Sequence, residues 1–177
     1  MTTQILRRDW LETVVIRHVR KEDLPALEWD GEFSHFRRVY AEAFERSQMG
    51  YSVMWVAELP EKGIIAQVFI QLICNRKELA DGIKRAYLYS FRVHHDFRHQ
   101  GLGSRMVHHV EKDLIQRSFQ VLTLNVAKDN LDALRLYLRL GFRIVAAEPG
   151  IWSYVDDKGI RQIVEEPAWR MEKNLYL

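Results

Sequence analysis

The chain has little cysteine, proline or glycine for its 177 residues, and it has no long hydrophobic run. Cys74 is the only cysteine, which excludes an internal disulfide and fits the reducing cytoplasm. Four prolines and nine glycines are too few for a low-complexity linker. The most apolar stretch, residues 64–74, is interrupted by Gln67 and Gln71 and is too short to cross a membrane. Residues 1–8 also lack the apolar core of a signal peptide. We therefore expect a cytoplasmic protein.

The chain also lacks a strong charge of either sign. Its formal net charge is +2, and it has no basic run with interleaved aromatic residues. We therefore expect neither a nucleic-acid partner nor a membrane partner. Hydrophobic residues make up 47% of the chain and charged residues 28%, which suits a sizeable core beneath a charged surface. The length and composition predict a single domain over residues 1–177.

Some segments alternate apolar and polar residues and others repeat apolar residues at helical spacing, and together these patterns predict an α/β (α+β) fold. The predicted strands cover residues 13–17, 52–58, 64–73, 86–93, 120–126, 142–146, 152–155, 160–164 and 169–174. The predicted helices are a short one that begins near residue 21 and longer ones at 33–50, 101–117 and 131–140. We expect a mixed central sheet of about seven strands with helices on both faces, and a hairpin at 152–164. Strand 120–126 follows a helix, so it should run parallel to strand 86–93.

The chain is organised around residues 93–104, which join a predicted strand to a predicted helix. The loop carries Arg98, and Gly101 and Gly103 open the helix. A helix start offers free N–H groups and the positive end of the helix dipole, and glycine lets a ligand approach them. Together with the charge of Arg98, this favours a phosphate or pyrophosphate ligand. A Walker loop is excluded by the lack of a Gly-x-x-x-x-Gly-Lys run, and the dinucleotide fingerprint fails at Met106.

The helix predicted at 131–140 presents an unusual face. Asn130, Ala133 and Tyr137 fall in line and offer an amide, a small gap and a phenol. Taken alone, this face has a simpler explanation, in which Asn130 caps the helix and Tyr137 is a core aromatic. A second face consists of leucines that we expect in the core, Leu131, Leu134 and Leu138.

Residues 93–104 resemble the acetyl-CoA-binding motif of the GNAT superfamily of N-acetyltransferases, which runs roughly Val-x-Pro-x-Tyr-Arg-Gly-x-Gly-x-Gly. The residues that match are Arg98, Gly101 and Gly103. The residues that replace the family's proline, tyrosine and first glycine are His95, Phe97 and His99. Residues 130–142 read Asn-x-x-Ala-x-x-x-Tyr-x-x-x-Gly-Phe, which resembles the second signature of the same superfamily. The two resemblances occur in the family's order, each after a predicted strand.

The resemblance implies direct transfer of an acetyl group from acetyl-CoA to a primary amine, with both substrates bound together. The two parallel strands would splay apart and admit the pantetheine arm, which would pair with the backbone of Phe91 and Val93. The pyrophosphate would lie on the loop and helix start, at Arg98, His99, Gln100, Gly101, Leu102, Gly103 and Ser104. Asn130 would reach the arm and Ala133 would leave room for it. The Val93 N–H would polarise the thioester carbonyl, and Tyr137 would protonate the leaving thiolate as general acid.

The resemblance does not place the base that must take a proton from the amine. Glu28, Asp30 and Glu32 are candidates. Two alternatives stay open: these three residues are only solvated loop carboxylates, or a relay of water molecules takes the proton and no single base is essential. Several histidines lie close together in the sequence and suggest a metal site. They are His94, His95, His99, His108 and His109. Adjacent histidines on a helix point about 100° apart, and a single cysteine offers no further ligands, so we expect no metal.

Three kinds of function stay open. The first is the N-acetyltransferase, the second an acyl-CoA-binding sensor without catalysis, and the third an interaction module that uses the hairpin near residues 152–169. Tyr137 favours the enzyme, since a sensor has no need of a phenol there. Trp152, Tyr154 and Trp169 either line an acceptor pocket, form the edge of a homodimer or simply pack. The acceptor itself is open among an antibiotic, a polyamine, an amino acid, a peptide N-terminus and a protein lysine.

Overall fold

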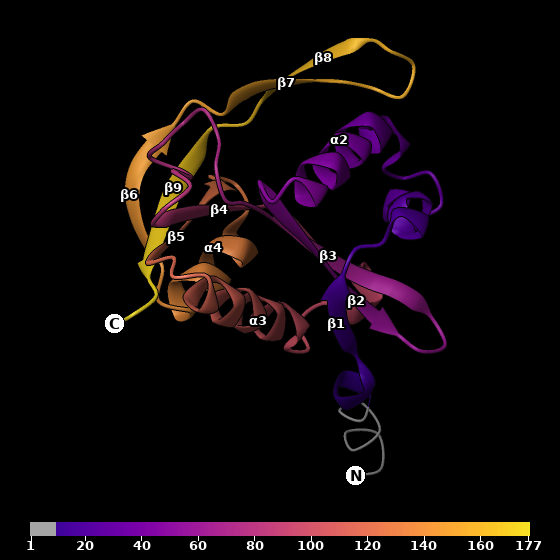
Figure 1. Cartoon of the computed structure of the whole chain (residues 1–177), viewed down its shortest axis with the longest axis horizontal. Helices are drawn as coiled ribbons and strands as arrows, with labels where there is room; N and C mark the ends of the chain where they lie inside the picture. Colours follow the sequence, from indigo (N-terminus) through magenta and orange to yellow (C-terminus); the bar gives the residue numbers. More distant parts are fainter. Residues whose placement is uncertain (1–9) are drawn as a thin grey trace.

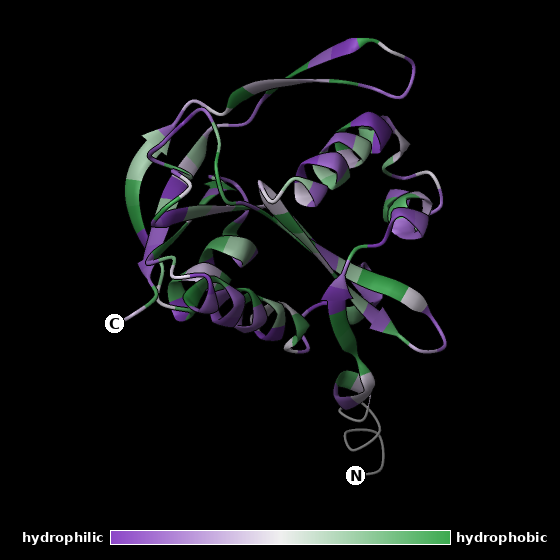
Figure 2. Ribbon diagram, viewed as in Figure 1, coloured by the Kyte–Doolittle hydropathy of each residue, from purple (hydrophilic) through white to green (hydrophobic). Residues whose placement is uncertain are grey.

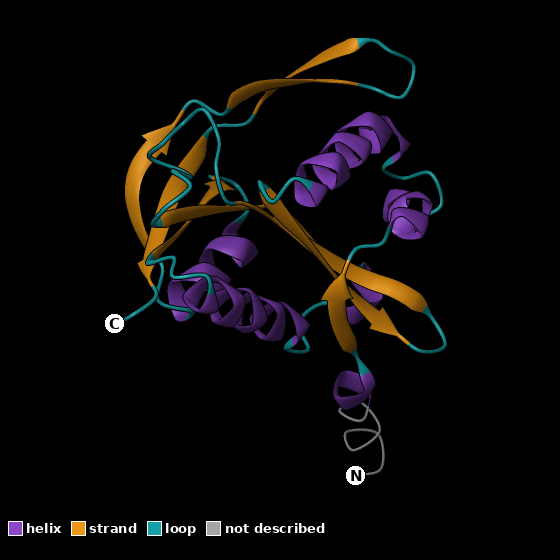
Figure 3. Ribbon diagram, in the orientation of Figure 1, coloured by secondary structure: helices purple, strands orange, loops and turns teal. Residues whose placement is uncertain are grey.

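A computed structural model describes residues 10–177, and its centre is a mixed sheet of seven strands (Figures 1 and 3). In spatial order the strands are β1 (Val15–His18), β2 (Ser52–Leu59), β3 (Gly63–Gln71), β4 (Arg85–Val93), β5 (Val121–Ala127), β9 (Ala168–Asn174) and β6 (Arg143–Glu148). All neighbours are antiparallel except β4 and β5, which are parallel. The predicted α/β class, the seven-stranded sheet and the parallel pair are therefore confirmed.

The helices lie on both faces of this sheet, as predicted (Figure 1). They are η1 (Lys21–Glu28), η2 (Ser34–Phe36), α2 (Arg37–Gln48), η3 (His95–Phe97), α3 (Leu102–Gln116) and α4 (Leu131–Arg139). The first predicted helix is 3-10 rather than α, because Pro25 lies inside it and supplies no N–H for an i to i−4 bond. No helix in residues 10–177 is long and apolar enough to span a membrane.

Each face of the sheet has its own hydrophobic layer. The apolar residues of α3 that were read from the sequence, Met106, Val107, Val110 and Leu114, are all buried against one face. On the other face, Tyr40 and Ala43 of α2 are buried with Leu27 and Phe69. Figure 2 shows hydrophilic residues along much of the visible side of α3, so the helix has the predicted amphipathic character.

Helix α4 departs from the sequence prediction. Leu131 is 53% exposed and Leu138 is 49% exposed, so the expectation that both lie in the core is wrong. The helix docks instead through Tyr137, which is buried, with Ala133 and Leu134 partly buried beside the core. A nine-residue helix has one face to bury, and here that face is the one carrying the phenol.

The parallel pairing between β4 and β5 ends halfway along both strands. The register runs from Arg85 opposite Val121 to Leu88 opposite Leu124 and stops there, although β4 continues to Val93. Beyond this point the two strands diverge, which confirms the predicted splay. On its other side β4 bulges against β3, where the register shifts and Ser90 takes a left-handed φ of 50°.

The last predicted hairpin forms a ribbon of its own, outside the main sheet. Strands β7 (Ile151–Val155) and β8 (Arg161–Glu165) pair only with each other and pass over α2 (Figure 1). Trp152 and Tyr154 lie 6.3 and 4.9 Å from Phe36, measured between ring centroids. The ribbon therefore packs on the start of α2 and borders the same side of the sheet.

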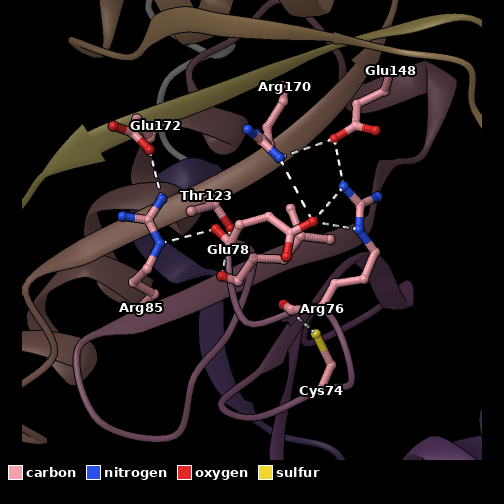
Figure 4. A network of polar contacts seen from close by, with 9 residues as sticks. Cys74, Arg76, Glu78, Arg85, Thr123, Glu148, Arg170 and Glu172 are labelled. Atoms are coloured by element: carbon pink, nitrogen blue, oxygen red, sulfur yellow. Dashed lines mark hydrogen bonds and ion pairs between the residues drawn. The ribbon is translucent and has the colours of Figure 1, made fainter.

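A network of ion pairs ties the loop before β4 to the far edge of the sheet (Figure 4). Glu148, which is buried, accepts from Arg76 at 2.7 Å and from Arg170 at 3.3 Å. Arg85, at the start of β4, donates to Glu172 of β9 at 2.6 Å. Arg85 and Glu172 thus tie β4 to β9 across β5, and Glu148 ties the loop before β4 to β6 and β9.

Replacing Glu148 with glutamine should test this network. Glu148→Gln should lower the free energy of unfolding by about 2 kcal/mol, because a buried ion pair that loses one charge leaves the other without compensation. Denaturant unfolding measures the change. Glu78→Gln is the matched control, since Glu78 pairs with the same arginine but is exposed, and it should change little. Equal effects of the two substitutions would contradict the assignment.

Candidate active site

The start of α3 presents a run of free backbone donors. The N–H of Arg98 donates to His95 and that of Arg105 to Gly101, but the six N–H groups of residues 99–104 donate to no residue that the structure describes. His99 has φ of 59° and Gly101 has φ of 97°, so left-handed residues alternate with others and the N–H groups converge. Such a concavity at the positive end of a helix is an anion site.

The side chains of this loop mostly hold its shape. Leu102 is buried in the core, so only its N–H is available to a ligand. The Gln100 side chain accepts from Trp10 and donates to the carbonyl of Asp96. Nε of Arg98 donates to the carbonyl of Val93 at 2.8 Å, which leaves the outer guanidinium nitrogens for an anion. His99 is exposed and Ser104 partly exposed beside the run of donors.

The two glycines of the motif have different reasons to be glycine. Gly101 caps the helix in the left-handed region, where a side chain would strain the backbone. A Cβ on Gly103 would meet the ring of Phe91 and a methyl group of Leu136, at the ordinary contact distance of 3.5 Å from each. That a larger side chain on Gly103 would keep a phosphate away stays a prediction. Its N–H still belongs to the free donors.

The gap between β4 and β5 exposes the backbone of β4. The N–H of His94 donates to Ile65 on β3 at 2.8 Å. Because antiparallel bonds alternate along a strand, the N–H of Val93 points the other way, toward β5 and the gap. Phe91 and Val93 are partly buried and pack on the core beneath α3. The geometry thus brings Val93 to the gap, one short loop away from the anion site.

Tyr137 reaches the sheet from α4. It is 7% exposed, and its ring meets that of Phe142 edge-on at 5.6 Å. Burial raises the pKa of the Tyr137 phenol well above its usual value, and the nearby phenol of Tyr87 raises it further. Burial also raises the pKa of Tyr87 to about 12. Both phenols are therefore protonated at neutral pH, so Tyr137 carries a proton and cannot serve as a base.

Asn130 has the capping role that its position indicated. Its Oδ1 accepts from the N–H of Ala133 at 3.2 Å, which satisfies one of the free donors at the start of α4. Its amide nitrogen stays available to a ligand. Ala133 is partly buried on the same helix face as Tyr137.

Two polar residues of the gap escaped the sequence analysis. Asn125 is the first residue of β5 beyond the last paired position, and its buried Oδ1 has no hydrogen-bond partner among residues 10–177. Tyr87 lies on β4 beside Asn125, and its ring stacks on Tyr89 at 5.9 Å. An asparagine inside an apolar strand is itself unusual, and this signal was available in the sequence.

The structure also places the residues that were candidates for a base or for metal ligands. Glu28 pairs with Arg37 at 2.8 Å, which lowers the pKa of its carboxyl and makes it a poor base. Asp30 and Glu32 are exposed. The side chains of His94, His95 and Asp96 bring one ligand atom each within 4.8 Å of one another, on the turn before the anion site. That no metal is used stays a prediction.

The unpartnered oxygen of Asn125 makes a prediction about stability. Asn125→Leu should change the free energy of unfolding by less than about 1 kcal/mol, because the cost of the unpartnered oxygen is removed together with the interaction of the Asn125 side chain with the Tyr87 phenol. Thr123→Val is the matched control, since the Thr123 hydroxyl donates to the carbonyls of Leu79 and Ala86 and its loss should be destabilising. Denaturant unfolding measures both. A marked loss of stability in Asn125→Leu would show that the oxygen has a structural partner.

Comparison with known proteins agrees with this geometry. The sequence model of the Acetyltransferase (GNAT) family matches residues 16–142. N-alpha-acetyltransferase 50 of Danio rerio is 24% identical over 132 residues, which cover 68% of this chain and 77% of the relative.

Solved structures share the fold at low identity. The ribosomal-protein-S18-alanine N-acetyltransferase of Escherichia coli superposes with a TM-score of 0.67 at 20% identity, over 92% of this chain and 94% of the other. A chimeric spermidine N-acetyltransferase of Vibrio cholerae gives a TM-score of 0.70 at 13% identity, over 93% and 96%. The family match spans the first strand, the gap, the anion site and α4, and the chain therefore belongs to the GNAT family of acetyltransferases.

Proposed function

We propose that this acetyltransferase uses acetyl-CoA as donor and a primary amine as acceptor, with both bound together and the acetyl group passed directly. The observation that carries the proposal is the run of six free N–H groups at residues 99–104, set at the mouth of the gap between β4 and β5. Acetyl-CoA is long and anionic and has a narrow pantetheine arm. These properties suit an anion site that lies beside a break in a sheet.

The residues fit such a donor along its length. The N–H groups of residues 99–104 and the outer nitrogens of Arg98 would hold the pyrophosphate. The backbone of Phe91 and Val93 would hold the arm as an added strand in the gap. Asn130 would offer its amide nitrogen to the arm, and Ala133 would leave room beside it.

Acetyl-CoA supplies an activated thioester, and the chain supplies position and charge. The N–H of Val93 polarises the thioester carbonyl where negative charge develops. The amine nitrogen bonds to the acetyl carbon as the carbon–sulfur bond breaks, and Tyr137 gives its proton to the sulfur. Asn125 accepts a hydrogen bond from the incoming amine, which would satisfy its buried oxygen. The proton that the amine loses passes to water.

Several expectations accompany this function as predictions. They are a single domain over residues 1–177, a cytoplasmic location, the lack of nucleic-acid, membrane and metal partners, and a possible homodimer.

Acetyl-CoA or CoA should bind and stabilise the fold. Saturation at about 100 times the dissociation constant should add about 2.7 kcal/mol to the free energy of unfolding. Thermal unfolding with and without CoA measures this. Gly101→Ala should weaken CoA binding by about 10-fold or more, because it disturbs several donors. Gly63→Ala has a similar φ of 81° in a distant turn and should keep full affinity. No shift at millimolar CoA would refute both the enzyme and the acyl-CoA sensor.

The hydroxyl of Tyr137 separates an enzyme from a sensor. Tyr137→Phe keeps the ring and its packing, so CoA affinity should stay within about twofold while turnover falls by about 10²-fold, as expected for a lost general acid. Release of free thiol with any reacting amine gives the turnover. A core tyrosine without a catalytic role would change stability by about 1 kcal/mol and leave turnover intact. That second outcome would transfer the role of acid to water or to another group in the gap.

A further inference from the structure

Arg92 lies in an aromatic cradle on the side of the sheet that carries α2. Its guanidinium carbon is 3.3 Å from the ring centroid of Phe33, 5.2 Å from that of Trp29 and 5.8 Å from that of Tyr40. Nη2 donates to the hydroxyl of Tyr40. These rings come from the segments that join β1 to β2 and cover the start of the gap.

This guanidinium has no anionic partner within residues 10–177, and its buried Nε has no partner of any kind there. Burial is the main influence on the pKa of Arg92 and lowers it, while Glu32 acts least. Arg17 shows the ordinary arrangement, since it is partly buried but pairs with Asp23 at 2.7 Å and Glu58 at 2.8 Å. Arg92 is partly buried, and an arginine in such a position is usually paired, as Arg17 is, so its guanidinium is open to an anionic partner from outside the chain.

The cradle is built from strained backbone. Trp29 and Asp30 have φ of 48° and 55°, and Gly31 follows with φ of 97°. A bulky residue such as tryptophan in the left-handed region is a genuine outlier and carries a cost. Strain of this kind persists mainly where function requires a side chain in one place, and here it sets Trp29 against Arg92.

The position of Arg92 along β4 places it next to the reaction. It directly precedes Val93, whose N–H we assign to the thioester carbonyl. The Val93 side chain packs with the core under α3, whereas Arg92 contacts Phe33 and Tyr40 on the opposite face. With the donor entering from the α3 side, the acceptor must approach from the face that Arg92 occupies.

We propose that Arg92 binds a carboxylate of the acceptor, so that the substrate is a small amine that carries a carboxylate, such as an amino acid. The proposal rests on the function proposed above. A guanidinium has five donors in a planar fork that matches a carboxylate, and one donor is used here by Tyr40. Because Arg92 directly precedes Val93, the carboxylate would lie close to the reacting amine, as it does in one small molecule. The competing explanation is that Arg92 only clamps the aromatic segments to β4 by cation–π contacts.

The test compares acceptors that differ only in the carboxylate, namely amino acids and their amides. Wild-type protein should acetylate the acid with a kcat/KM about 10- to 100-fold above that of the amide, as expected for hydrogen bonds to a charged group. Arg92→Gln should remove this preference, mainly through KM of the acid, and leave CoA affinity unchanged. Arg92→Lys keeps the charge in the cradle and should retain part of the preference. Arg117→Gln, at the far end of α3, should behave as wild type.

Equal loss of rate for acids and amides in Arg92→Gln, or no preference in wild-type protein, would overturn the proposal and leave a structural clamp. If CoA binds but no amine reacts, the proposed function fails separately, and calorimetry decides the role of Arg92. Binding of the amino acid to the CoA-loaded wild-type protein, but not of its amide and not to Arg92→Gln, would support the carboxylate site. No binding of any amino acid would overturn it.

Discussion

The structure depends on one break in hydrogen bonding, where β4 and β5 stop pairing after Leu88 and Leu124. A parallel pair inside a sheet is ordinarily continuous, because every unpaired N–H and C=O in a buried strand costs free energy. Around this break, β4 bulges against β3 at Ser90, and the ion pair of Arg85 with Glu172 ties the paired half of β4 to β9 across β5. The strand therefore keeps free backbone groups at the centre of the molecule, where a second molecule can complete the sheet.

The cost of this arrangement appears in residues around the break. Gln67, fully buried on β3, donates to the carbonyl and hydroxyl of Ser90 and so braces the bulge, but its own Oε1 has no partner among the described residues. Asn125 has a similarly unpartnered oxygen across the gap. Left-handed residues occur on both sides, at Trp29 near the acceptor face and at His99 near the anion site. Strained backbone and unsatisfied polar atoms are therefore found on both sides of the break, although the buried Nε1 of Trp55, which packs on His109 of α3, shows that they are not confined to it.

The sequence predicted the elements of the proposed donor side well, because these elements are contiguous in the chain. Residues 85–104 contain the strand, the anion loop and the start of the helix. Asn130 and Tyr137 belong to a single helix, with Asn130 as the N-cap of α4 and Tyr137 inside it. The wrong predictions concern the direction in which helix side chains point, because helical spacing alone does not determine which face of a helix is buried. Leu131 and Leu138 repeat at helical spacing but face away, because the helix docks by Tyr137.

The acceptor side could not be read in this way, since it is assembled from segments far apart in the chain. Arg92 comes from β4, its aromatic neighbours come from residues 29–40, and Tyr154 closes over Phe36 from a ribbon near the C-terminus. Each residue taken alone has an ordinary explanation as a packing aromatic or a surface charge. Only the folded arrangement shows a partly buried guanidinium that has no carboxylate partner among residues 10–177. The proposed donor site is therefore encoded in a local pattern, whereas the proposed acceptor site is encoded in tertiary contacts that related chains can vary separately. This separation explains why one fold can keep the same donor chemistry while its acceptors differ.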